Sequence, residues 1–212
     1  MRTATIEKVF HLLSTKYPEP KTELKYINNY TFLISVVLSA QSTDVSVNKA
    51  TKDLFKIVKN PKAMIKFGET SLKKYIKTIG LYNVKAKNLI KLSRILINEY
   101  NNKIPKDFHL LTSLPGVGKK SASVYQNTIL NMPRVAVDTH VFRVSNRIGF
   151  TKTKTADLTQ IQLEKIIPKK WLMTAHHLLI LHGRKICKAR KPLCKLCPIQ
   201  KFCHYKNNEL KY

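Results

Sequence analysis

The sequence has few acidic side chains, few glycines and few cysteines, and it has no long hydrophobic run. Only 12 aspartates and glutamates stand against 39 lysines and arginines, which gives a net charge of +27 over 212 residues. Such an excess argues against a basic partner and points to a polyanion, with DNA or RNA as the first candidate. A second explanation stays open, because lysines are spread along the whole chain and an A/T-rich genome also enriches lysine, isoleucine and asparagine.

The missing hydrophobic run excludes a membrane span. The most apolar stretch, residues 30–40, is far shorter than the roughly 20 residues that a helix needs to cross a bilayer. The first residues also lack the apolar core of a secretory signal. We therefore expect a cytoplasmic protein without a membrane partner, associated with the nucleoid of a bacterial-type cell if its partner is DNA.

Alternating runs joined by hairpin turns are absent, and helical periodicity dominates instead. The chain is predicted to be all-α, with about ten or eleven short helices and no long linker between domains. One of these helices is expected to begin after Asp138, a residue type that caps helix N-termini, and to end at Gly149.

All four cysteines lie in one stretch of seventeen residues, Cys187, Cys194, Cys197 and Cys203. Random placement would bring them so close in about two chains per thousand, so the cluster indicates a metal site. A disulfide framework is not expected inside a cell. Zinc sites usually combine two close cysteine pairs, whereas only Cys194 and Cys197 are close here, which favours an iron–sulfur cluster and leaves zinc open.

The stretch LPGVGKK at residues 114–120 does not match the motif of a nucleotide-binding P-loop. Ser113 stands where that motif needs its first glycine, and Lys120 replaces its serine or threonine. What remains is a glycine turn at Gly116 and Gly118, which brings backbone N–H groups near a helix N-terminus and suits a DNA phosphate. A plain turn between two helices is the alternative.

Three motifs in this order carry a resemblance to a known family: LPGVGKKSA, VAVDTHVFRVSNR and C-x₆-C-x₂-C-x₅-C. Together with residues 38–51, 75–89 and 176–187, they resemble the endonuclease III family of helix-hairpin-helix DNA glycosylases with abasic-site lyase activity. The resemblance implies two helical domains flanking a DNA-binding cleft. One is a six-helix barrel domain at residues 22–132, with the helix-hairpin-helix at about 107–130. The other combines residues 1–21 and 133–212 and holds a [4Fe–4S] cluster on its four cysteines in the loop 187–203.

The resemblance also implies the chemistry. Lys120 matches the nucleophile, whose neutral amine attacks C1′ of the damaged nucleotide and forms a Schiff base before β-elimination breaks the strand on the 3′ side. Asp138 matches the carboxylate that assists by stabilising positive charge on the sugar and by proton transfer. Neighbouring residues on a helix point about 100° apart, so Lys119 and Lys120 do not face the same substrate atom.

The implied partner is double-stranded DNA that contains oxidised pyrimidines or abasic sites, bound by a monomer. An enzyme that acts on a base must take it out of the stack, and the resemblance assigns the filling of the resulting gap to Gln41 and Leu81. The other DNA contacts are expected at the hairpin and near the cysteines, from Gly116, Gly118, Lys119, Arg190 and Lys191.

Two other functions remain open from the sequence. A monofunctional adenine-mismatch glycosylase shares the hairpin, the aspartate and the cysteine spacing, but it lacks the lysine found here at position 120. A non-catalytic DNA-binding module would need neither Lys120 nor Asp138. His176, His177 and His182 lack the i, i+4 spacing of a metal pair on a helix, so we interpret them as packing or polar-face residues.

Overall fold

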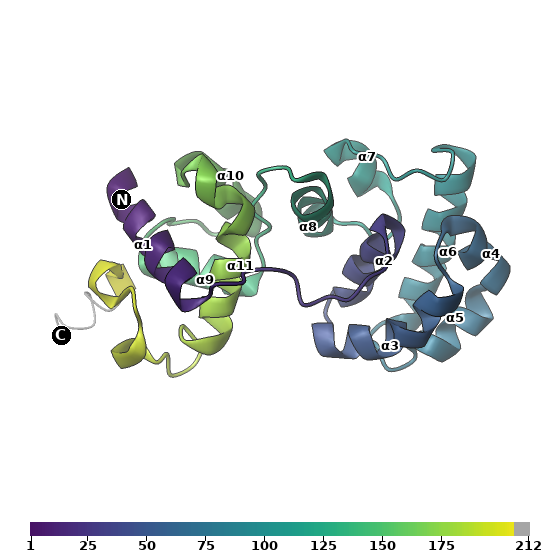
Figure 1. The fold of residues 1–212 in the computed structure, drawn as a ribbon, viewed down its shortest axis with the longest axis horizontal. Helices are drawn as coiled ribbons and strands as arrows, with labels where there is room; N and C mark the ends of the chain where they lie inside the picture. Colours follow the sequence, from purple (N-terminus) through teal and green to yellow (C-terminus); the bar gives the residue numbers. More distant parts are fainter. Residues whose placement is uncertain (206–212) are drawn as a thin grey trace. The chain divides into compact units, whose positions relative to one another are not determined.

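The computed structural model describes residues 1–205, and within them it consists of helices and loops without a strand (Figure 1). The all-α prediction is therefore confirmed for this part of the chain. The contacts divide the chain into two compact units, which are described separately. The first unit combines residues 1–22 with those from 131 onward, and the second unit is residues 23–130.

The second unit is built from seven helical segments, of which α4 and α5 are separated only by Gly68. They are α2 (Asn29–Ser39), α3 (Asp44–Ile57), α4 (Pro61–Phe67), α5 (Glu69–Ile76), α6 (Tyr82–Asn98), α7 (Phe108–Ser113) and α8 (Lys119–Leu130).

Helix α2 is the centre of the second unit. Every side chain from residue 30 to residue 38 is buried, because α2 contacts α3, α6 and α8 around it. Its N-terminus is fixed by Asn28, whose side chain accepts a hydrogen bond from the backbone N–H of Thr31. A helix that is apolar on all sides requires such a buried position, and it makes α2 a rigid base for the loop that follows its C-terminus.

Within residues 1–205, the elements of the first unit are four α-helices and two short 3₁₀ turns. They are α1 (Thr3–Lys16), α9 (Thr139–Ile148), α10 (Ala156–Ile166), α11 (Lys169–Lys185), η1 (Cys194–Leu196) and η2 (Gln200–Phe202). Helix α11 packs against α1 and α9, and Phe10 stacks on both Phe150 and Trp171 with centroid distances of 5.6 and 5.9 Å. The loop with the four cysteines follows α11 and contains both 3₁₀ turns.

Two helices begin directly after residues that are predicted to contact DNA. Helix α8 begins at Lys119, because the carbonyl of Gly118 already accepts a hydrogen bond from the N–H of Ala122 at 2.9 Å. Helix α6 begins at Tyr82, so that Leu81 stands at its N-cap position. In residues 1–205, no helix has the length and apolarity that crossing a membrane requires.

Candidate functional site

The glycine turn joins α7 to α8 in the geometry that its sequence predicts. The N–H of Val117 donates to the carbonyl of Leu114 at 3.0 Å, which closes a turn with Pro115 and Gly116 at its centre. Gly116 has a φ of 83°, as the third position of a type II turn requires. The turn ends at Val117 and α8 begins at Lys119, so the first N–H groups of α8, which lack partners within the helix, lie directly after the turn.

Gly116 and Gly118 differ in whether the protein's own structure requires a glycine. A Cβ on Gly116 would lie 3.1 Å from Cγ1 of Val37 in addition to having an unfavourable φ, so both backbone and packing require glycine there. A Cβ on Gly118 would meet no atom within 4 Å. Gly118 is thus not required by the protein's own packing, and the open space in front of it leaves room for another molecule.

Lys119 and Lys120 form the first turn of α8, and both are exposed. Their backbone position at a helix N-terminus favours an anion close by. Because Lys120 is exposed, its amine is accessible to a bound substrate.

Asp138 is the N-cap of α9, as predicted. One carboxylate oxygen, Oδ1, accepts a hydrogen bond from the N–H of Val141 at 2.8 Å, and the residue is half-buried after the buried segment 135–137. The cap fixes the direction of the carboxylate while its second oxygen remains available. Lys120 lies in the second unit and Asp138 in the first, and their meeting stays a prediction.

Three of the predicted DNA-contact residues share an unusual backbone conformation. In residues 1–205, six residues other than glycine have positive φ; three of these are asparagines, which tolerate it. The other three are Gln41 (54°), Leu81 (58°) and Lys191 (50°). A left-handed conformation costs such residues about 1–2 kcal/mol each, and strain of this kind clusters at functional sites. All three residues are exposed.

Gln41 and Leu81 belong to adjacent loops of the second unit. A Cβ built on Gly80 would lie 3.7 Å from the carbonyl oxygen of Gln41, so the loop after α2 touches the loop before α6. Leu81 has 60% of its surface exposed although it is a large apolar residue. The structure thus places next to each other the two loops that carry Gln41 and Leu81, the residues to which the gap in DNA was assigned.

The four cysteines surround one place in the first unit. The Cys197 thiol interacts electrostatically with those of Cys187, Cys194 and Cys203. Burial, with the other thiols adding to it, raises the pKa of Cys197 to about 11. Within residues 1–205, no three histidine, cysteine or acidic side chains converge tightly enough to hold a single metal ion.

Two arginines of α9 hold the cysteine loop. Arg147 donates to the carbonyls of Lys188 and Ala189 at 2.7 and 2.9 Å, and its guanidinium lies 3.6 Å from the Cys187 sulfur. Arg143 donates to the carbonyl of Cys187 at 3.1 Å. The two arginines thus fix the backbone of the cysteine loop and place a guanidinium beside the Cys187 sulfur.

His182 also belongs to this site, which the histidine spacing had not indicated. Its Nε2 lies 3.6 Å from the Cys197 sulfur, and its Nδ1 lies 3.5 Å from the Tyr17 hydroxyl. Burial lowers the pKa of His182 to about 4, so the imidazole is neutral at neutral pH. His176 is buried as well and lies against the ring of His177, as the packing interpretation predicts.

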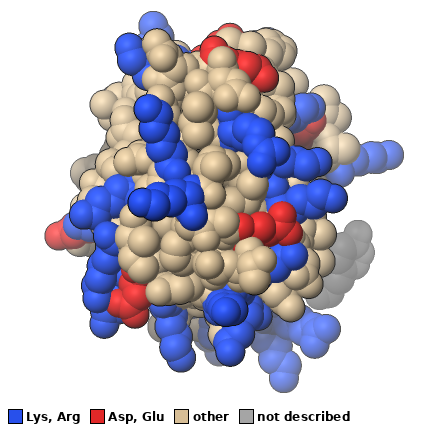
Figure 2. Space-filling view, turned by 90° about the vertical axis from the view of Figure 1, so that its right-hand side faces the viewer, with Lys and Arg blue, Asp and Glu red and all other residues tan. Residues whose placement is uncertain are grey.

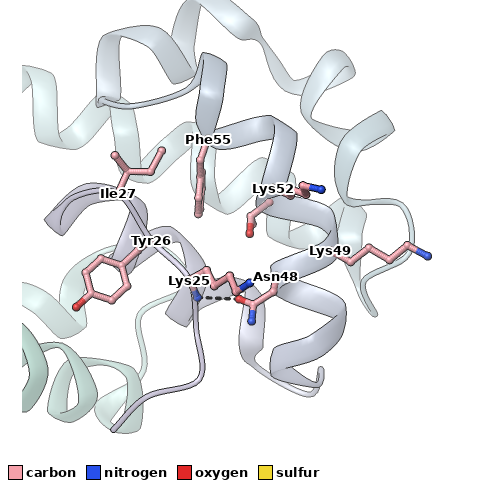
Figure 3. A pocket seen from close by; sticks show the side chains of 8 residues that line it. Lys25, Tyr26, Ile27, Asn48, Lys49, Lys52 and Phe55 are labelled. Atoms are coloured by element: carbon pink, nitrogen blue, oxygen red, sulfur yellow. Dashed lines mark hydrogen bonds between the residues drawn. The ribbon is translucent and has the colours of Figure 1, made fainter.

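Two features outside the predicted site are visible on the surface. Figure 2 shows lysines and arginines spread over the face that it displays, with few acidic side chains among them and without a single basic stripe. A hollow of about 380 Å³ lies between the segment at Tyr26 and Ile27 and the side chains of α3, including Lys52 and Phe55 (Figure 3). None of the predicted site residues lines this hollow.

Comparison with known proteins gives a consistent family relationship. The model of the HhH-GPD superfamily of base excision DNA repair proteins matches residues 34–169. Endonuclease III of Rickettsia conorii is 54% identical over 205 residues, which cover 97% of this chain and 98% of that protein. Endonuclease III of Escherichia coli K12 is 47% identical, with 97% of this chain and 98% of that protein covered.

Solved structures agree with these relatives. A trapped covalent intermediate of endonuclease III with DNA is similar with a TM-score of 0.92 and 39% identity, covering 99% of both chains. A non-covalent complex of endonuclease III with DNA also has a TM-score of 0.92 and 39% identity, and it covers both chains fully. A thermostable thymine-DNA glycosylase shares the fold, with a TM-score of 0.85 over 97% of this chain and 98% of that chain at 24% identity.

Proposed function

The chain belongs to the endonuclease III family of HhH-GPD base excision DNA repair proteins, and from this premise we propose that Lys120 and Asp138 carry its chemistry. As a member of that family it is a DNA glycosylase and abasic-site lyase. The observation that supports the assignment best is the position of Lys120, which is exposed in the first turn of α8 directly after the glycine turn.

The proposed reaction begins with the neutral amine of Lys120. Nζ attacks C1′ of the damaged nucleotide while the bond from C1′ to the base breaks, and the base leaves with a proton. Opening of the sugar ring yields a Schiff base between Nζ and C1′. Loss of a proton from C2′ then expels the 3′ phosphate by β-elimination, and water hydrolyses the Schiff base to release Lys120.

Asp138 is proposed to stabilise the positive charge that develops on the sugar as the glycosidic bond breaks. Because Val141 fixes Oδ1, the second carboxylate oxygen is held ready without loss of further side-chain entropy. This oxygen is also the proposed site of proton transfer. The segment directly before Asp138 is buried, which anchors this cap in the core of the first unit.

The DNA contacts are proposed at two places on the second unit and one on the first. Gly116, Gly118 and Lys119 bind a phosphate at the N-terminus of α8, where Gly118 leaves space for close approach. Gln41 and Leu81 enter the duplex where the damaged nucleotide has left it, because a polar and an apolar tip project from adjacent loops. Arg190 and Lys191 contact phosphates beside the cysteine loop.

We propose that Cys187, Cys194, Cys197 and Cys203 hold a [4Fe–4S] cluster. The four thiols are electrostatic neighbours in one loop. Zinc sites usually combine two close cysteine pairs, whereas only Cys194 and Cys197 are close in sequence here, which favours the iron–sulfur cluster. Arg147 fixes the loop through its hydrogen bonds to Lys188 and Ala189 and would offset the negative charge of a bound cluster, which would in turn hold the residues around Arg190 in place.

The finer assignments concern substrate, assembly and location. We propose oxidised pyrimidines as the damaged bases, a monomer as the active form, and the bacterial cytoplasm at the nucleoid as the location. We also propose that the two units correspond to the family's six-helix domain and cluster domain, with limits near residues 22 and 132. Sedimentation of the purified protein with and without a lesion duplex tests whether the active form is a monomer.

The catalytic assignment is tested by single-turnover cleavage of a duplex with one oxidised pyrimidine. Lys120→Ala is expected to abolish both base release and strand cleavage, whereas the matched variant Lys119→Ala retains cleavage with weaker DNA binding. Base release without strand cleavage by the wild-type protein would instead identify a monofunctional glycosylase. Full activity of Lys120→Ala would show that another group is the nucleophile.

A further inference from the structure

Lys85 carries a charged side chain that is buried, which is unusual in the described part of the chain. Among residues 1–205 it is the only lysine, arginine, aspartate or glutamate that is buried, with 6% of its surface exposed. Lysine is almost never buried without partners, because removing its charge from water is costly. Burial also lowers the pKa of Lys85. The position of Lys85 therefore requires an explanation in the contacts that its ammonium makes.

The ammonium of Lys85 binds the end of α2 and the loop that follows. Its Nζ lies 2.9 Å from the carbonyl oxygen of Leu38, 2.6 Å from that of Ala40 and 3.1 Å from Oγ of Ser42. Three oxygens thus match the three donors of an ammonium group. The carbonyls at a helix C-terminus lack partners within the helix and carry partial negative charge, so a cation is favoured there.

Gln41 lies between two of these three partners. The residues before and after it, Ala40 and Ser42, are both bound by Nζ, and Gln41 itself has the left-handed φ of 54°. A turn that is clamped on both sides keeps a conformation that its own residue disfavours. The side chain of Gln41 is exposed, while the side chain that fixes its backbone is buried.

The backbone of Lys85 holds the second loop. Its N–H donates to the carbonyl of Leu81 at 3.0 Å, which closes the first turn of α6 directly after the left-handed residue Leu81. The same residue is therefore bonded to Leu81 through its main chain and to both neighbours of Gln41 through its side chain. The two loops also lie next to each other at Gly80.

We propose that Lys85 is a positioning residue that sets the spacing and direction of Gln41 and Leu81, so that both side chains enter the DNA duplex together. The proposal rests on the proposed role of these two residues in filling the space left by the extruded nucleotide. Lys85 does not touch the substrate, and its effect is confined to steps that need a gap in a duplex to be filled. A rigid pair of side chains loses little entropy when it enters DNA, which favours the extruded state.

The test compares two substrates in single-turnover kinetics with the full-length, cluster-loaded protein. The first is a duplex with one oxidised pyrimidine, from which a base must be extruded, and the second is a single strand with one abasic site, which leaves no gap. For Lys85→Met we expect about a 10- to 100-fold lower rate on the duplex, the range for losing hydrogen bonds from a charged donor, and little change on the single strand. Lys91→Met is the matched control, because Lys91 is exposed on the same helix.

A double-mutant comparison separates positioning from a merely structural role. In a protein that already carries Gln41→Ala and Leu81→Ala, Lys85→Met is expected to cause no further loss on the duplex. Equal losses on both substrates, or an undiminished loss in the triple variant, would overturn the proposal. If Lys85→Met does not fold, Lys85→Gln, which keeps two N–H donors without the charge, takes its place.

Failure of the proposed function gives a different result from failure of this inference. If the wild-type protein cleaves neither substrate, the assignment of Lys120 as the nucleophile fails. If the wild-type protein cleaves both and Lys85→Met behaves like Lys91→Met, the function stands and the positioning role is refuted.

Discussion

Alanine substitutions at Gly116 and Gly118 are expected to have opposite consequences, although the two residues are only two positions apart. At Gly116, alanine adopts a left-handed φ of 83° at a cost of about 1–2 kcal/mol. Its Cβ also stands 3.1 Å from Cγ1 of Val37, which has to move by a few tenths of an ångström. We therefore expect Gly116→Ala to reduce the free energy of unfolding by at least about 1–2 kcal/mol.

At Gly118 the two effects of an alanine substitution on stability nearly cancel. Alanine restricts the unfolded chain, which stabilises the folded protein by about 0.4–1 kcal/mol. At a helix N-terminus, however, alanine is less favourable than glycine by a similar amount. Its Cβ meets no protein atom within 4 Å. In the DNA complex, however, the added methyl group occupies the space through which a phosphate reaches the N-terminus of α8. A loss of charge-assisted hydrogen bonds of about 1.5–3 kcal/mol weakens binding by about tenfold or more.

Two measurements on both variants test this reasoning. Thermal unfolding is expected to show a midpoint lowered by about 2–8 °C for Gly116→Ala and nearly unchanged for Gly118→Ala. Fluorescence anisotropy with a duplex that carries a stable abasic-site analogue, at one fixed salt concentration, is expected to show the larger loss of affinity for folded Gly118→Ala. A destabilised Gly118→Ala, or a stable one with wild-type affinity, would refute the assignment of this space to DNA.

Two further predictions concern Asp138 and Arg147. Asp138→Asn keeps the helix cap and Asp138→Ala loses it, so the alanine variant alone is expected to lose about 0.5–2 kcal/mol of stability in thermal unfolding. Both variants are expected to lose most base-release activity, and wild-type activity in Asp138→Asn would contradict the role of the charge. Arg147→Met removes the donors to Lys188 and Ala189, and it is expected to lose iron on dialysis while the helical circular dichroism is kept. Unchanged iron content per chain would show that Arg147 does not hold the loop.

Features with a local sequence signal could be predicted. The glycine turn at residues 114–118 follows from Pro115 and Gly116, and the N-cap at Asp138 follows from an acidic residue placed before an amphipathic helix. The all-α class follows from helical periodicity along the chain. These features depend on residues that are close in sequence, where backbone preferences and hydrogen bonds act directly.

Features that depend on contacts between distant residues could not be predicted. Gln41 and Leu81 have left-handed backbones although neither residue type favours them, and the fixing contact comes from Lys85. Lys85 itself is one of many lysines in the sequence. Only its hydrogen bonds to the C-terminal end of α2 and to the residue before α6 distinguish it from the others. Folding likewise brings Arg147 and His182 to the cysteine loop, although they lie forty and five residues before its first cysteine in the sequence.

The central claim is that the amine of Lys120 forms the covalent intermediate. The most direct measurement is borohydride reduction during reaction with a duplex that has one abasic site, followed by mass spectrometry of the digested protein–DNA adduct. The expected result is an adduct on the peptide that carries Lys120, with no adduct from Lys120→Ala. An adduct on Lys119 or elsewhere, or no adduct from folded and cluster-loaded protein, would contradict the claim.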